Sequence, residues 1–213
     1  MKHGDIKRFA RTHFPDSAVG GRCIHVDMSC AFTFTLYFQV AAQTAGLSYI
    51  WVSIQTLMDQ NYDVNFTLGD RFRKPDNNQI WTDAEAFDRQ FLTSPQYRLY
   101  SSLTREDKLY GFIKENYEAG RSDLRFLETA YYVAVYFGEL GWAAEVSNHL
   151  ERLMRGFPEQ PWHAPLLTEV HAIRTLIHQS GPAATRTLLI RRALENRKRM
   201  GLPCNLCDAE LKR

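Results

Sequence analysis

The chain has 213 residues, of which 45% are hydrophobic and 13% aromatic, and its net charge is +2. This composition predicts one globular domain with a full hydrophobic core, and it excludes a chain that is mainly disordered. No apolar run reaches the roughly 18 residues that a membrane span needs, and the first residues lack the apolar segment of a signal peptide. The sequence therefore predicts a soluble, cytoplasmic protein with no membrane partner.

The small net charge conceals an uneven distribution along the chain. Residues 1–75 carry a net charge of +2, residues 76–170 a net charge of −6, and residues 171–213 a net charge of +6. A polyanion would therefore meet the two ends of the chain and not its middle. The alternative for the basic end is a solvated C-terminal helix with no ligand.

The first 80 residues combine a short helix with segments of strand character. A helix is expected at about 5–12, and every even position from Ile24 to Val40 is apolar or small, which is the period of a β-strand. Seventeen residues are long for one strand, so a turn near 27–29 is expected to divide the segment into a hairpin. The spacing within 47–59 favours a helix, with a buried strand as the alternative, and 62–68 alternates like a strand before a polar loop.

From Thr82 onward the pattern is helical and is interrupted by Gly and Pro. Because the strand-like and helical segments are segregated along the chain, the sequence predicts an α+β fold without a doubly wound sheet and without strands after residue 125. A β-containing region at 1–75, with a basic loop, is expected to pack on a helical array at 76–213. The expected helices are 83–93, 105–118, 124–140, 142–156, 163–179 and 183–200.

One pair of these helices resembles a tetratricopeptide unit over about 35 residues. Gly141 is expected to allow close helix approach, and the aromatic run from Tyr131 to Phe137 is expected to form buried helix core. The alternative is an ordinary helical bundle with one repeat-like hairpin, because a lone unit cannot bury its own face. The residues at repeat spacing are Ala134, Phe137, Leu140, Gly141, Val146, Leu150, Leu153 and Pro158.

The four cysteines lie near the two ends of the chain, which favours a metal site over disulfides in a cytosolic protein of this size. Cys204 and Cys207 form a Cys-x-x-Cys pair of the kind that binds zinc in knuckles, and Cys23 and Cys30 supply a second pair. We expect one structural Zn²⁺ on these four residues, joining the β-containing region to the last helix. His25 is an alternative ligand in place of one cysteine, and a redox pair is a further alternative.

Two basic segments are candidates for contact with nucleic acid. The last long helix carries cations on the side away from its apolar stripe, and the loop after residue 70 combines three cations with one aromatic ring that could stack on a base. Both segments also have a structural explanation, since cations favour helix C-termini and exposed loops. The candidate residues are Arg191, Arg192, Lys198 and Arg199 in the helix, and Arg71, Phe72, Arg73 and Lys74 in the loop.

The overall layout resembles the small zinc-containing large subunit of type IV CRISPR effector complexes. The resemblance is carried by a short N-terminal helix, a mixed core with basic edges, and the positions of Cys23, Cys30, Cys204 and Cys207. The Cys-x6-Cys spacing of the first pair and the tetratricopeptide-like hairpin depart from that family. The resemblance implies a non-nuclease subunit that contacts guide RNA and the DNA that flanks the target.

The sequence contains no phosphate-binding loop, dinucleotide-binding motif, nucleophile elbow or zinc-protease motif. The main expectation is therefore a non-enzymatic nucleic-acid-binding subunit of a ribonucleoprotein, with RNA or DNA and other protein subunits as partners. The alternative is a tetratricopeptide-like protein–protein adaptor with a structural zinc. A metal-dependent hydrolase using His25 and Asp27 is a third possibility that lacks an evident general base.

Overall fold

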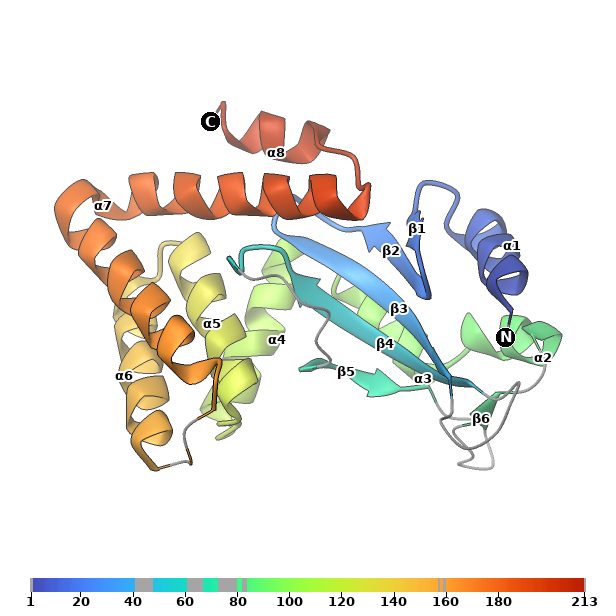
Figure 1. Cartoon of the computed structure of the whole chain (residues 1–213), viewed down its shortest axis with the longest axis horizontal. Coiled ribbons are helices and arrows are strands. Elements are labelled where there is room, and N and C mark those ends of the chain that lie inside the picture. Colours follow the sequence, from blue (N-terminus) through green and yellow to red (C-terminus); the bar gives the residue numbers. More distant parts are fainter. Residues whose placement is uncertain are drawn as a thin grey trace.

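The computed structural model describes residues 2–40, 48–60, 67–72, 80–81, 84–156, 158 and 160–212. In this part of the chain the strands form one sheet, and the residues from 84 onward form helices without strands (Figure 1). This segregation confirms the predicted α+β class. None of the described helices is both long and apolar enough to cross a membrane.

The described elements follow one another in a simple order. The strands are β1 (Ala18–Gly20), β2 (Cys23–Asp27), β3 (Phe32–Val40), β4 (Ser48–Thr56), β5 (Leu68–Arg71) and β6 (Ile80–Trp81). The helices are α1 (His3–His13), α2 (Ala84–Phe91), α3 (Pro95–Ser102), α4 (Glu106–Glu118), α5 (Leu124–Tyr136), α6 (Leu140–Gly156), α7 (His163–Met200) and α8 (Asn205–Glu210). Because β6 lies beyond residue 75, the sheet extends past the predicted boundary of the β-containing region.

The sheet is antiparallel, with the order β1-β2-β3-β4-β5 and β6 paired to the start of β4. The predicted hairpin is confirmed: β2 and β3 pair from Asp27 opposite Thr33 to Cys23 opposite Tyr37. The chain turns between these strands at 28–31, close to the expected position. The residues expected to form a strand at 62–66 lie outside the described residues, and strand β5 begins at Leu68.

The predicted helix at 47–59 is wrong, because most of this segment is strand β4. Ile50, Val52 and Ile54 are buried on one face of the strand, and they pair with the alternating apolar residues of β3. The segment has helical spacing because apolar residues occupy both faces of strand β4, so that they do not simply alternate with polar residues. Pairing with β3 satisfies the backbone along the whole segment, so the strand is the stable alternative.

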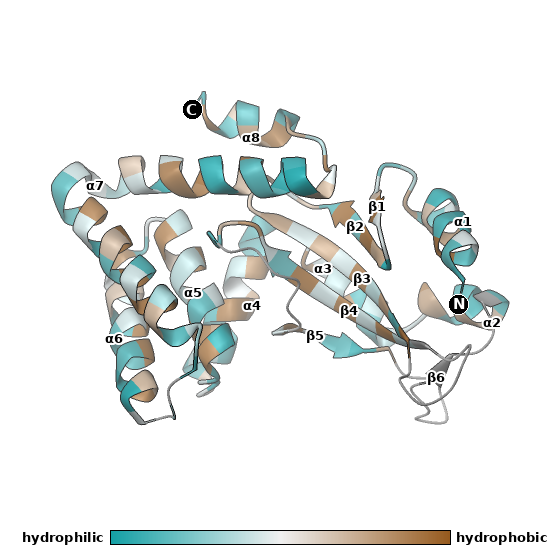
Figure 2. Ribbon diagram, viewed as in Figure 1, coloured by the Kyte–Doolittle hydropathy of each residue, from teal (hydrophilic) through white to brown (hydrophobic). Residues whose placement is uncertain are grey.

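One face of the sheet packs on an aromatic cluster that joins the first three helices to the strands. Figure 2 shows the alternation of apolar and polar residues along β3 and β4 that produces this face. Phe34 contacts Tyr97 and Tyr100 of α3, and Phe38 meets Phe87 of α2 edge to face with ring centroids 5.8 Å apart. Burial of these large rings supplies much of the hydrophobic stabilisation of this half of the molecule.

Helix α5 forms the centre of the helical half, and every residue from Phe126 to Tyr136 is buried. It packs on α4, α6 and α7, while Tyr136 meets Phe32 of the sheet edge to face. The expectation that the run from Tyr131 forms buried helix core is confirmed. A single apolar core therefore extends from the sheet into the helices.

Helices α5 and α6 form the hairpin that was predicted from the tetratricopeptide-like spacing, but a different glycine makes its turn. Gly138 has a φ of +77°, a left-handed conformation that favours glycine. Gly141 is exposed, and a Cβ at that position would have no neighbour within 4 Å. The expectation that Gly141 allows the two helices to approach closely is therefore wrong.

Helix α7 bends sharply at Gly181, which has φ 80° and ψ 174° and is followed by Pro182. The two predicted helices at 163–179 and 183–200 correspond to the halves on either side of this bend. The first half packs on α5, and the second half crosses the end of the sheet, with α8 running back beside it (Figure 1). The bend thus lets one helix contact both halves of the molecule.

The second half of α7 is fixed to the sheet by a polar cluster that we call the C-terminal clasp, formed by Arg197 and Asn196 with their partners. The guanidinium of Arg197 is fully buried, and it donates to Asp27 Oδ1, Ser29 O and Pro203 O at 2.6 Å each. Asn196 Nδ2 donates to the carbonyls of Leu57 and Asp59. These bonds satisfy a charge that would otherwise be very costly to bury.

Replacing Arg197 should therefore destabilise the fold far more than replacing an exposed arginine of the same helix. We expect Arg197→Met to lower the free energy of unfolding by about 3–5 kcal/mol, because the Asp27 carboxylate and two carbonyls lose their donors. Urea unfolding followed by tryptophan fluorescence measures this change. The matched control is Arg191→Met, which should change stability by less than about 0.5 kcal/mol, and equal effects of the two substitutions would contradict the role of the clasp.

Candidate functional site

The structure brings two of the four cysteines together. Cys30, in the turn between β2 and β3, forms a disulfide with Cys207 of α8, and their Cα atoms are 4.7 Å apart. Cys23 is a buried free thiol, and burial raises its pKa to about 11. Cys204 is a partly exposed free thiol beside the N-terminus of α8. The chain ends are thus joined next to the C-terminal clasp, through a disulfide.

The expected zinc ligands are not gathered into one site. Among the described residues, which include all four cysteines, no group of three or more His, Cys, Asp or Glu side chains is arranged to hold a metal ion. His25, the alternative ligand, is buried, and its Nδ1 lies 3.0 Å from Thr35 Oγ1. Burial lowers its pKa to about 4, so the ring is neutral at physiological pH. The zinc site remains a prediction from the cysteine spacing.

The basic residues of the last long helix divide into two sets. Arg191, Lys198 and Arg199 are exposed on the second half of α7. Arg192 does not join them: it turns inward and forms an ion pair with Glu169 on the first half of the helix. The expectation that all four cations share one outer face is therefore wrong for Arg192, because the bend places a buried carboxylate within its reach.

The loop predicted to bind nucleic acid is partly strand and core. Arg71 is the last residue of β5, and its guanidinium lies 4.7 Å from the ring centroid of Tyr49 and 4.6 Å from that of Trp51. Phe72 is only 1% exposed and packs edge to face on Phe87, so its ring is not available to stack on a base. Arg73 and Lys74 lie outside the described residues.

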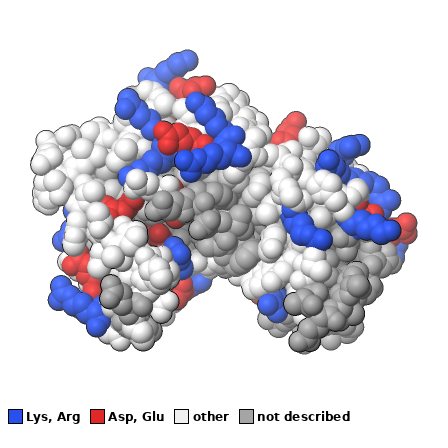
Figure 3. Space-filling model, viewed as in Figure 1, with Lys and Arg blue, Asp and Glu red and all other residues white. Residues whose placement is uncertain are grey.

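A further basic group, which the sequence analysis did not single out, lies on α1. Ile6, Phe9 and Ala10 face the core, and Lys7, Arg8 and Arg11 are exposed on the other side of the helix. Figure 3 shows basic side chains over α1 and over the second half of α7 and α8 on the same face of the molecule. The amphipathic spacing of residues 5–12 was the signal that could have located this group.

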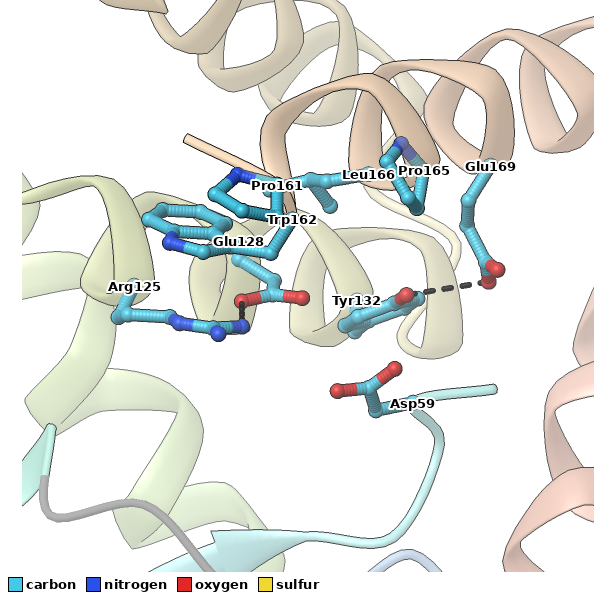
Figure 4. Close-up of a pocket in the computed structure, with 9 residues that line it drawn as sticks. All are labelled: Asp59, Arg125, Glu128, Tyr132, Pro161, Trp162, Pro165, Leu166 and Glu169. Atoms are coloured by element: carbon cyan, nitrogen blue, oxygen red, sulfur yellow. Dashed lines mark hydrogen bonds and ion pairs between the residues drawn. The ribbon is translucent and has the colours of Figure 1, made fainter. Parts of the chain in front are cut away.

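A pocket of about 360 Å³ lies between α5 and the first half of α7 (Figure 4). Its wall combines apolar side chains with aromatic rings and several charges. Arg125 of α5 lies flat against Trp162, with its Cζ 4.1 Å from the ring centroid, and donates to Glu128 Oε2 at 2.8 Å. The lining residues are Asp59, Arg125, Glu128, Tyr132, Pro161, Trp162, Pro165, Leu166 and Glu169.

Two carboxyl groups of this pocket, those of Glu128 and Glu169, have raised pKa values. Burial and the nearby charge of Asp59 raise the pKa of Glu128 to about 7, although Arg125 opposes the shift. Burial also raises the pKa of Glu169, which accepts a hydrogen bond from the Tyr132 hydroxyl at 3.0 Å. Ionisable groups with shifted pKa values in a pocket are candidates for binding or proton transfer.

This pocket could not be recognised from the sequence, because its charged residues come from three separate segments. Local spacing links only part of the lining: Arg125, Glu128 and Tyr132 share one face of α5 at spacings of three and four residues. No protein-family model, curated protein or solved structure matches the chain. Function is therefore inferred from the geometry of the basic face and of the pocket.

The disulfide between Cys30 and Cys207 leaves two of the four cysteines free to react with a thiol reagent. In protein unfolded without reductant, a thiol reagent should modify Cys23 and Cys204 only, and after reduction it should modify all four cysteines. Mass spectrometry of the alkylated peptides identifies the residues. A chain that yields four thiols without reduction and carries one zinc ion would contradict the disulfide and support the four-cysteine zinc site.

The raised pKa of Glu128 predicts that this residue destabilises the fold as the pH rises. Between about 4.5 and about 7 the unfolded chain has lost the proton that the folded chain keeps, so the contribution of Glu128 to stability falls across this range and is constant outside it. The change in the free energy of unfolding caused by Glu128→Gln should therefore be about 3 kcal/mol more favourable at pH 8 than at pH 4.

Urea unfolding of both proteins at the two pH values measures this difference. Glu118→Gln, at an exposed position on α4, is the matched control and should show no such pH dependence. A Glu128→Gln variant whose stability relative to the native chain is the same at both pH values would show that the carboxyl group titrates normally.

Proposed function

We propose that the protein binds nucleic acid through the exposed cations at its two ends. The observation that supports this proposal best is that the basic residues of α1 and of the second half of α7 lie on one face (Figure 3). Cations spaced over a surface neutralise successive phosphates and release counterions, which is the main source of affinity in such complexes.

The rigidity of α7 favours the same function. The C-terminal clasp and the disulfide hold the second half of the helix against the sheet, so Arg191, Lys198 and Arg199 project from a fixed backbone. A fixed backbone leaves less conformational entropy to lose when phosphates bind. Glu195 lies one turn from Arg191 and one turn from Arg199, and it reduces the local positive charge. Binding to this face should consequently be moderate and strongly salt-dependent.

Because the described part of the loop is not a stacking platform, the proposal concerns phosphate contacts and not base recognition. RNA and DNA are both candidates. Membership of a ribonucleoprotein, the resemblance to type IV CRISPR subunits, the cytoplasmic location and the structural zinc all stay predictions from the sequence. The adaptor alternative also remains, and its binding would depend on apolar contact and change little with salt.

A charge-reversal experiment tests the proposal with a control of identical net charge. Arg191→Glu combined with Arg199→Glu should weaken binding of a labelled 20-nucleotide RNA, and of the matching DNA duplex, at least tenfold at 100 mM salt. The slope of log binding constant against log salt concentration should become shallower by about 1.5, because each lost phosphate contact reduces this slope by roughly 0.7–0.9. Fluorescence anisotropy between 50 and 300 mM salt measures both quantities.

The matched control is Arg152→Glu combined with Arg155→Glu, two exposed positions on α6 near several carboxylates. This variant changes the net charge equally and should bind almost as the native chain does. A second variant that reverses Lys7 and Arg8 on α1 tests the other basic group. Equal affinity and salt slope for the α7 variant and the native chain, in folded proteins, would show that α7 is not the binding face.

A further inference from the structure

The pocket between α5 and α7 has the size and composition of a small-molecule site. Its volume of about 360 Å³ lies within the usual range for ligand pockets, which are mostly apolar with a few convergent polar groups. Pro165 and Leu166 form an apolar wall, and Trp162 adds a large aromatic ring. The carboxyl groups of Glu128, Asp59 and Glu169 surround the same space in Figure 4.

One of these carboxylates has an oxygen that accepts no hydrogen bond from the described residues. Glu128 is only 6% exposed, and Arg125 donates to its Oε2, whereas no described residue donates a hydrogen bond to its Oε1. In Figure 4 this second oxygen points away from Arg125 into the pocket. A carboxylate oxygen that accepts no hydrogen bond from the described residues is open to a charge-assisted hydrogen bond from a ligand.

The cations next to the pocket are already engaged. Arg125 is held between the Trp162 ring and Glu128, and Arg192 pairs with Glu169. Among the described residues that line the pocket, an anionic ligand would therefore meet carboxylates without a free cation to receive it. The charge of Asp59 and the burial of Glu128 both disfavour ionised Glu128 in the empty pocket, and a positive charge placed there would relieve this effect.

We propose that this pocket binds a small organic cation, an ammonium or guanidinium group carried on a short apolar chain. The cationic group donates to Glu128 Oε1 and lies between the carboxylates of Glu128 and Asp59. The apolar chain lies against Pro165 and Leu166. This site is distinct from the basic face, and the proposal does not depend on nucleic-acid binding.

Four ligands with a four-carbon chain and different charge test the proposal on the whole chain. Butylguanidinium and butylamine carry the expected cation, butanol is neutral, and butyrate is an anion. At pH 8, isothermal titration calorimetry should detect at least one of the two cations with a dissociation constant below about 1 mM, and butanol and butyrate should bind at least tenfold more weakly. Failure of both cations to bind, or equal binding of butyrate, would overturn the proposal.

Two substitutions locate the ligand within the pocket. Glu128→Gln should weaken cation binding at least tenfold, whereas Glu118→Gln, an exposed carboxylate on α4, should leave it unchanged. Leu166→Phe fills the apolar wall without altering charge and should also weaken binding at least tenfold. Circular dichroism confirms that each variant is folded, and native affinity in a folded Glu128→Gln or Leu166→Phe variant would place the cation elsewhere and overturn the assignment.

Discussion

The buried guanidinium of Arg197 joins parts of the chain that are 170 residues apart, and it holds the second half of α7 against the sheet. Its three hydrogen bonds satisfy Asp27, the turn after β2 and the segment after α7. Because a buried cation is tolerated only when it is paired and hydrogen-bonded, these contacts hold the second half of α7 in its position on the sheet. That position sets the direction in which Arg191, Lys198 and Arg199 face solvent, and it brings Arg192 over Glu169.

The bend at Gly181 gives the two halves of α7 separate environments. The first half lines the pocket and packs on the buried helix α5, whereas the second half carries cations on its outer side. Arg192 belongs to the second half but pairs with a carboxylate of the first, so one ion pair connects the two arms of the bend. The acidic pocket and the basic face are consequently neighbours in space although their charges have opposite sign.

Much of the fold could be predicted from the sequence, but the residues that fix its tertiary contacts could not. Period-two alternation located the β2–β3 hairpin, and helical spacing with breaks at Gly and Pro located α1, α2 and α4 to α7 within a few residues, whereas α3 and α8 were not predicted. Strand β4 was missed because Ile50 and Ile54 fit helical spacing as well as strand spacing, and only the partner strand β3 decides between them. Arg197 is the buried arginine because it lies one turn after Ala193, on the apolar side of the helix. This position could have been noticed in the sequence, but a charged side chain is not normally expected on a buried face.

The long separation between Asp27 and Arg197 also determines when the molecule can complete its fold during synthesis. A ribosome adds residues in order, so the sheet and the turn after β2 are made long before the arginine that neutralises Asp27. Until Arg197 emerges, Asp27 and the turn after β2 lack the donor that α7 supplies. The nascent chain must therefore keep this carboxylate in water until Arg197 has been made, and the contact between the sheet and the second half of α7 forms late in folding.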